Sequence, residues 1–260
     1  MIKFINKIIH KLLSTFDYLL IKKEDIINFR LDDLKLSLVD KKNKKYLTVE
    51  NLITYFYSKS KDSKSQLFQD LFVDFILKKR RGTYCEVGAL DGVELSNTYY
   101  LEKKLGWKGI LCEPNKSYFK KIKKNRPKNI IITDPVDSKI QKLINFGETS
   151  GGRSSIINHK NKSQFKKRYF LKTTNLNNVF FKYLKFKKID YLSIDTEGNE
   201  YEIISTLNFK LYKPKIITIE HNYEFTKREK IFKLLKNKGY TRVFKSISRF
   251  EDWYIQKNLK

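Results

Sequence analysis

Short apolar runs alternate with helix-length segments along most of the chain. Five of these runs are TYCEVG, GILCEP, NIIITDPV, IDYLSID and KIITIE, which begin at residues 83, 109, 129, 189 and 215. Strands separated by helices form βαβ units, and helices cover both faces of the resulting parallel sheet. The pattern therefore predicts an α/β fold built around a parallel sheet.

The last part of the chain has a different pattern. YTRVFKSI and DWYIQK, within residues 240–257, are separated only by SRFE, which predicts an antiparallel hairpin. Five strands in βα alternation followed by an antiparallel pair are typical of class I methyltransferases. We therefore expect their Rossmann-like fold over residues 65–260: a seven-stranded, mostly parallel sheet with helices on both faces.

The first 60 residues differ from the rest of the chain. They are rich in lysine and contain no glycine or proline, so we expect a basic helical N-terminal extension over 1–60. The polar segment at 58–65, SKSKDSKS, suits a linker. The next stretch, SQLFQDLFVDFILKKR, is amphipathic and predicts a helix with Ser65 as its N-cap.

Residues 1–20 carry an apolar stripe at helical spacing with lysines on the other face: Ile5, Ile9, Leu12, Phe16 and Leu19. Such a stripe either docks on the body of the protein, which we favour, or rests on an anionic membrane surface. Lysines interrupt the run, so it is a poor signal peptide. No window reaches the ~18 apolar residues of a membrane span.

The chain is strongly basic, with 55 Lys and Arg against 28 Asp and Glu and a net charge of +27. This balance favours phosphate, nucleic acid or anionic membrane as partners. However, lysine greatly outnumbers arginine and is scattered, which favours a solvated surface over a dedicated polyanion site. Cys85 and Cys112 both lie in apolar runs, which indicates buried thiols in a reduced, cytoplasmic protein.

Glycines and acids follow the first two strands. Glu86, Gly88 and Gly92 have the spacing E-x-G-x-x-x-G, and glycine at a strand-to-helix turn lets the backbone approach a ligand, although a simple tight turn gives the same pattern. Residues 96–98, Ser-Asn-Thr, are expected to cap the next helix. Glu113 ends the second strand, where a carboxylate can accept hydrogen bonds from both hydroxyls of a ribose. Together these features favour a nucleoside site.

The fourth run leads into an acidic stretch, IDTEGNEYEI. Asp195 lies at the carboxyl end of its strand, where open α/β sheets bind ligands. Glu200 and Glu202 suit the dipole of the following helix. The fifth run ends in Glu220 and His221, and a histidine in this position is either a general base or a structural side chain.

These motifs together resemble the FkbM-type methyltransferases, a family of S-adenosylmethionine-dependent O-methyltransferases. The likeness rests on SQLFQDLF, CEVGALDGVELSNTYYLEKKLGWKGILCEPN, TNLNNVF, IDYLSIDTEGNEYEII and IITIEHN, which span roughly Ser65 to Trp253. Together with the positions of the strand ends, the resemblance implies a set of residues that contact the cofactor. These candidates are Glu86, Gly88, Ala89, Asp91, Gly92, Asn97, Glu113, Pro114, Asp134, Val136 and Asp195. The resemblance places four residues around the methyl group and the acceptor, namely Asp195, Glu197, Glu220 and His221.

The resemblance implies methyl transfer to a hydroxyl of a sugar, a glycan such as a polysaccharide, or a related metabolite, with SGGRSSI at 150–156 as the acceptor loop. A base at His221 or Asp195 would take the hydroxyl proton. Alternatively, Asp195, Glu197 and Glu220 would hold a divalent cation that acidifies the hydroxyl, although we favour the metal-free site. An RNA-modifying methyltransferase and a non-catalytic binding module on the same fold stay open.

Overall fold

The computed structural model describes residues 38–40, 45–149, 152–157, 165, 167–184 and 188–259. The amphipathic stretch expected at residues 1–20 lies outside this part of the chain. Within it, no helix is both long enough and apolar enough to cross a membrane.

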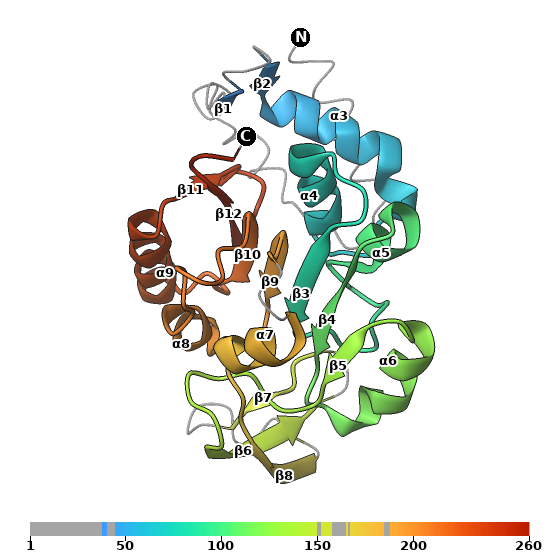
Figure 1. Ribbon diagram of the computed structural model, residues 1–260, viewed down its shortest axis with the longest axis vertical. Coiled ribbons are helices and arrows are strands. Elements are labelled where there is room, and N and C mark those ends of the chain that lie inside the picture. The colour runs from blue at the N-terminus through green and yellow to red at the C-terminus, as the bar shows by residue number, and fades with distance from the viewer. Residues whose placement is uncertain are drawn as a thin grey trace.

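Seven strands form the central sheet, in the order β5-β4-β3-β9-β10-β12-β11 (Figure 1). Their bounds are β3 Thr83–Val87, β4 Lys108–Cys112, β5 Ile130–Ile132, β9 Tyr191–Ile194, β10 Ile216–Glu220, β11 Tyr240–Val243 and β12 Glu251–Gln256. The five strands from β5 to β10 are parallel, and β12 is antiparallel to both of its neighbours. The predicted mostly parallel sheet with an antiparallel C-terminal pair is therefore confirmed.

Alternate residues of the strands enter two separate hydrophobic clusters, because successive side chains of a strand point to opposite faces. Tyr84 packs into one cluster and Cys85 into the other. One cluster contains helices α3 (Val49–Lys59), α4 (Gln69–Leu77), α5 (Tyr99–Leu105) and α6 (Phe119–Asn125). The other contains helices α7 (Leu176–Leu184), α8 (Glu200–Ser205) and α9 (Phe225–Asn237). Cys85 and Cys112 are buried free thiols, as expected.

The region before residue 65 is not entirely helical. Strands β1 (Leu38–Asp40) and β2 (Lys45–Leu47) form an antiparallel pair before helix α3. Helix α3 packs into the same cluster as α4, with the Phe56 ring 5.1 Å from the ring of Phe68. The 58–65 segment includes a 3-10 turn (Ser60–Asp62) and connects two helices of one core, so it is not an open linker.

One predicted helix cap is wrong, and a second is right in position but makes no capping hydrogen bond. Helix α4 begins after Phe68, and the Ser65 hydroxyl donates instead to buried Asp70, 2.7 Å away. Helix α5 begins after Thr98, whose side chain makes no cap and donates to Glu86. In both places the hydroxyl donates to a buried carboxylate, because leaving that carboxylate without a hydrogen-bond partner would be costly.

A second, smaller sheet was not predicted. Strands β6 (Leu143–Glu148), β7 (Ser155–Ile156) and β8 (Lys167–Lys172) pair antiparallel in the order β7-β6-β8. This sheet is inserted between β5 and α7 and lies at the end of the molecule that is distant from α3 (Figure 1). It therefore lies where the carboxyl ends of the central strands point.

We predict that Phe56→Ala lowers the free energy of unfolding by roughly 3 kcal/mol or more, because it removes a buried ring from the core that α3 shares with α4. Thr54→Ala on the exposed face of the same helix is the control and should change stability by less than about 0.5 kcal/mol. Urea unfolding of the full chain measures both. Equal, small effects would show that α3 is not part of the core.

Candidate active site

A cavity of about 230 Å³ opens at the carboxyl edge of the central sheet. Its walls come from the turns after β3, β4, β5 and β9 and from the small sheet. The candidate residues that line it are Gly88, Asn97, Glu113, Pro114, Val136, Asp195 and Glu197. The candidates outside the lining are Glu86, Ala89, Asp91, Gly92, Asp134, Glu220 and His221. The sheet therefore brings the ends of four strands to one place, as the sequence predicted.

The glycine turn after β3 packs directly against the end of β9. A Cβ at Gly88 would lie 1.8 Å from the Asp195 carbonyl oxygen, and the backbone there has φ +92°. The Asp195 N–H donates to the carbonyl of Val87 at 2.9 Å. Only glycine permits this approach, which fixes Asp195 beside the turn.

Glu86 holds the loop between β3 and α5 instead of lining the cavity. Its carboxylate accepts hydrogen bonds from the Ser96 hydroxyl at 3.0 Å, the Asn97 N–H at 2.5 Å and the Thr98 hydroxyl at 2.5 Å. Burial raises the pKa of Glu86, while Arg126 and these hydrogen bonds oppose the shift. The residue acts on the cavity through Asn97, which its carboxylate positions.

Buried Arg126 is a positioning residue that the sequence did not reveal. Its guanidinium donates to the carbonyl of Gly92 at 2.8 Å and to the Thr98 hydroxyl at 3.0 Å. A Cβ at Gly92 would lie 2.8 Å from the Arg126 side chain. Gly92 therefore makes room for Arg126.

Asp91 does not reach the cavity. Its carboxylate accepts hydrogen bonds within its own turn, from the N–H groups of residues 93 and 94.

Glu113 lines the cavity and remains only 4% exposed. One carboxylate oxygen accepts from the Leu90 N–H and the other from the Asn115 N–H, both at 2.8 Å. Each oxygen of a carboxylate has a second lone pair, so two further donors can be bound. Burial raises the pKa of Glu113 to about 7, with nearby Glu148 adding to the rise.

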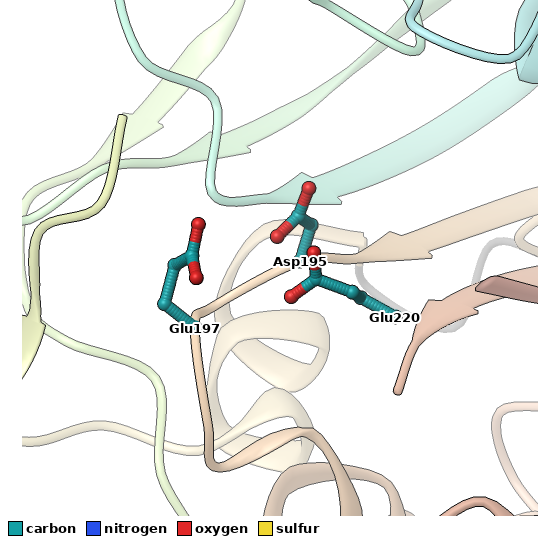
Figure 2. A group of neighbouring side chains, drawn as sticks. All are labelled: Asp195, Glu197 and Glu220. Atoms are coloured by element: carbon teal, nitrogen blue, oxygen red, sulfur yellow. The ribbon is translucent and has the colours of Figure 1, made fainter. Parts of the chain in front are cut away.

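Three carboxylates converge beside the glycine turn. Figure 2 shows Asp195, which follows β9, close to Glu220, at the end of β10, with Glu197 to their left. One oxygen of each lies within 4.8 Å of the others. No ion pair within the described part of the chain includes any of the three.

The three carboxylates hold protons more tightly than free carboxylates do. Burial raises the pKa of Asp195, and repulsion from Glu251, Glu197 and Glu200 raises it further. Burial and the charge of Asp195 likewise raise the pKa of Glu220. Because the two carboxyl groups are close together, ionisation of Asp195 or Glu220 makes ionisation of the other less favourable.

Residues 196–200 form a turn that is held by Glu200. The Glu200 carboxylate accepts hydrogen bonds from the N–H groups of Thr196 at 3.1 Å and Gly198 at 2.8 Å. Its other oxygen pairs with Lys227 at 2.9 Å. Glu200 begins α8, as the helix-dipole interpretation requires, but its side chain also closes the turn that carries Glu197.

Two more residues lie beside the carboxylates, and one of them, Glu251, was missed in the sequence. The Asn222 side chain donates to Glu220 at 2.7 Å. Buried Glu251 lies directly opposite Glu220 in the β10–β12 register, and burial raises its pKa to about 7. Glu251 belongs to a strand that is remote in sequence, so only the sheet pairing reveals it.

His221 is not brought together with the three carboxylates in the cavity. It is 1% exposed, and its Nδ1 accepts a hydrogen bond from the Tyr223 N–H at 3.0 Å. Its Nε2 lies 3.9 Å from Asp252, on β12, and burial lowers the pKa of the ring. This geometry favours the carboxylates over His221 as the proton acceptor.

The site can be matched to two kinds of cation. Three carboxylate oxygens within 4.8 Å of one another satisfy the oxygen preference of Mg²⁺ or Ca²⁺. They equally suit an organic cation in an acidic cavity, since Glu113 lines the same space. Carboxylate geometry alone does not distinguish the two.

The strand order and the cavity at the carboxyl edge define a class I methyltransferase fold. The chain belongs to the FkbM methyltransferase family, because the model described as the methyltransferase FkbM domain matches residues 86–242. It is accordingly an S-adenosylmethionine-dependent methyltransferase. A search of curated proteins gives no match.

Solved structures with a similar fold are distant in sequence. The methyltransferase FkbM from Methylobacillus flagellatus is 8% identical with a TM-score of 0.45, covering 79% of this chain and 60% of that one. The precorrin-6y C5,15-methyltransferase from Geobacter metallireducens is 12% identical with a TM-score of 0.42, covering 75% of this chain and 89% of that one. A putative rRNA methylase from Clostridium thermocellum is 11% identical with a TM-score of 0.38, covering 70% of this chain and 90% of that one. None of these likenesses indicates an acceptor.

We predict that Glu113→Gln changes how stability depends on pH in the cofactor-free protein. The carboxyl pKa is about 7 when folded and 4.5 in its reference state, so the folded state binds the proton more tightly. Stability from this group is complete below pH 4.5 and is lost as pH rises through 7, a difference of roughly 3 kcal/mol. Urea unfolding at several pH values should show wild type losing stability relative to Glu113→Gln over that range. Parallel curves would contradict the buried, protonated carboxyl.

Proposed function

We propose that this protein transfers a methyl group from S-adenosylmethionine to a hydroxyl of a sugar, a glycan or a related metabolite. The convergence of Asp195, Glu197 and Glu220 beside the glycine turn is the observation that supports it most. Carboxylates bind hydroxyl groups as acceptors, and one of them can also remove the hydroxyl proton. A site for hydroxyl methylation needs both abilities.

The residues present fit the cofactor. The cavity is acidic where a cationic sulfonium would lie, through Asp195 and Glu197. Glu113 has lone pairs available for the two ribose hydroxyls. Val136 and Phe146 provide apolar surface for the adenine. Gly88 lines the cavity, and its missing side chain lets the turn after β3 pack against the Asp195 carbonyl.

When bound, the cofactor supplies a methyl group that is activated by its sulfonium sulfur. The part of the chain would be to hold the acceptor oxygen in line with that methyl group and to take up the proton of the hydroxyl. Asp195 in its ionised form takes the proton of the hydroxyl, and Glu220 shares it. The fixed positions of Gly88 and Asp195 align the reacting atoms, which is mainly an orientation effect.

The metal-free form of this reaction is the one we propose. The raised pKa values of Asp195 and Glu220 give the pair a place for the released proton without a cation. The side chain of Asn222 already occupies one oxygen of Glu220. Direct contact of these oxygens with sugar hydroxyls then completes the acceptor site.

Substitutions should separate cofactor binding from chemistry. Glu113→Ala should weaken S-adenosylmethionine binding about tenfold or more, because two ribose hydroxyls lose their acceptor. Asp195→Asn should leave that affinity within about threefold but lower turnover roughly 100-fold, since the base is lost. Calorimetry measures binding, and S-adenosylhomocysteine release with a panel of methyl glycosides measures turnover. Full turnover by Asp195→Asn would exclude Asp195 as the base, and absence of cofactor binding by wild type would exclude the proposed function.

Removal of metal ions should have no effect on turnover. Dialysis against EDTA followed by assay in metal-free buffer should retain full activity, because the proton goes to a carboxylate and not to a metal-bound group. Added Mg²⁺ or Ca²⁺ serves as the control and should not stimulate. Loss of activity that Mg²⁺ restores would favour the cation-bound alternative at Asp195, Glu197 and Glu220.

A further inference from the structure

Arg153 is the only basic residue among the described residues that line the cavity. Three acidic residues, Glu113, Asp195 and Glu197, line the same cavity. A single fixed cation in an acidic cavity is informative, because neither the sulfonium nor the ammonium of the cofactor would attract it. Its positive charge instead needs an anion.

The backbone around Arg153 is anchored on both sides. The Ser154 hydroxyl accepts a hydrogen bond from the Asn115 side chain at 2.9 Å, and Asn115 follows the strand that ends in Glu113. Ser155 belongs to β7 and pairs with Gly147 of β6. On the other side, Gly152 has φ +92° and packs beside Leu90. The small sheet therefore presents Arg153 at a defined point of the cavity wall.

The guanidinium is not used within the described part of the protein. Among the described residues, its side chain makes no ion pair and no hydrogen bond with another side chain, and it remains exposed. Burial and Glu200 raise the pKa of Glu197, and the nearby positive charge of Arg153 opposes that rise.

Two anions could meet Arg153: the α-carboxylate of the cofactor or a group on the acceptor. Glu113 and Val136 mark the nucleoside side of the cavity. The charge of Arg153 acts on Glu197, which Figure 2 shows with Asp195 and Glu220, the carboxylates that the proposed function assigns to the acceptor. This position favours the acceptor.

We propose that Arg153 makes the acceptor site selective for an anionic saccharide, one that carries a carboxylate or a phosphate near the methylated hydroxyl. The inference rests on the proposed function and adds the charge of its substrate. A guanidinium binds either anion through paired N–H donors, so both sources share one recognition chemistry.

Binding to the complex of the full chain with S-adenosylhomocysteine tests the proposal. The probes are methyl β-D-glucopyranosiduronate, D-glucose 6-phosphate and neutral methyl β-D-glucopyranoside. Ligand-observed NMR titration measures the affinity of the complex for each of them. At least one anionic probe should bind roughly tenfold tighter than the neutral one. The better of the two anions identifies the carboxylate or the phosphate as the recognised group. Equal affinity of all three, or no binding by any, would overturn the proposal.

Variants assign the preference to this side chain. Arg153→Gln should reduce anion affinity to the level of the neutral probe, with neutral-probe and S-adenosylhomocysteine affinities unchanged, and Arg153→Lys should keep part of it. Arg80→Gln removes the same charge from an exposed site before β3 and should change nothing. An equal loss in Arg80→Gln would indicate a long-range charge effect, and a loss of S-adenosylhomocysteine affinity in Arg153→Gln would assign Arg153 to the cofactor; either result overturns the proposal. Failure of wild type to bind S-adenosylhomocysteine would instead contradict the proposed function.

Discussion

The close contact between the turn after β3 and the end of β9 is the constraint on which the site depends. Gly88 touches the carbonyl of Asp195 at a distance where no side chain fits. This contact sets where the glycine turn can receive a ligand and where the first acidic side chain projects. The loop that follows is then fixed by buried polar groups. Glu86 accepts a hydrogen bond from its backbone, and Arg126 donates one to it.

Negative charge is concentrated at this edge although the chain as a whole carries +27. Burying Asp195, Glu220 and Glu251 together is unfavourable, and the raised pKa values express that cost. Within the described residues, no ion pair with a lysine involves Asp195, Glu220 or Glu251, and the Asn222 side chain donates a hydrogen bond to Glu220. The result is a pocket suited to a cationic cofactor and ready to take up a proton.

Much of this arrangement was readable from the sequence. Each predicted strand of the central sheet formed, and Gly88, Glu113 and Asp195 meet at one edge because parallel strands end there together. Polar residues near helix starts were harder to interpret. Ser65 and Thr98 are residue types that commonly cap helices. Their hydroxyls instead donate hydrogen bonds to Asp70 and Glu86, whose burial depends on the tertiary fold. His221 similarly follows β10, yet packs toward β12 and away from the cavity.

The sequence by itself determined the elements and the strand ends, because hydrophobic periodicity and glycine placement act over a few neighbouring residues. Only the tertiary structure decided which groups meet across long separations. Glu251 enters the acidic group through pairing with β10, and Arg153 reaches the cavity through a small sheet whose strands have no distinctive local pattern. The pKa of each carboxyl was decided in the same way, since it depends on burial and on charges supplied by distant segments.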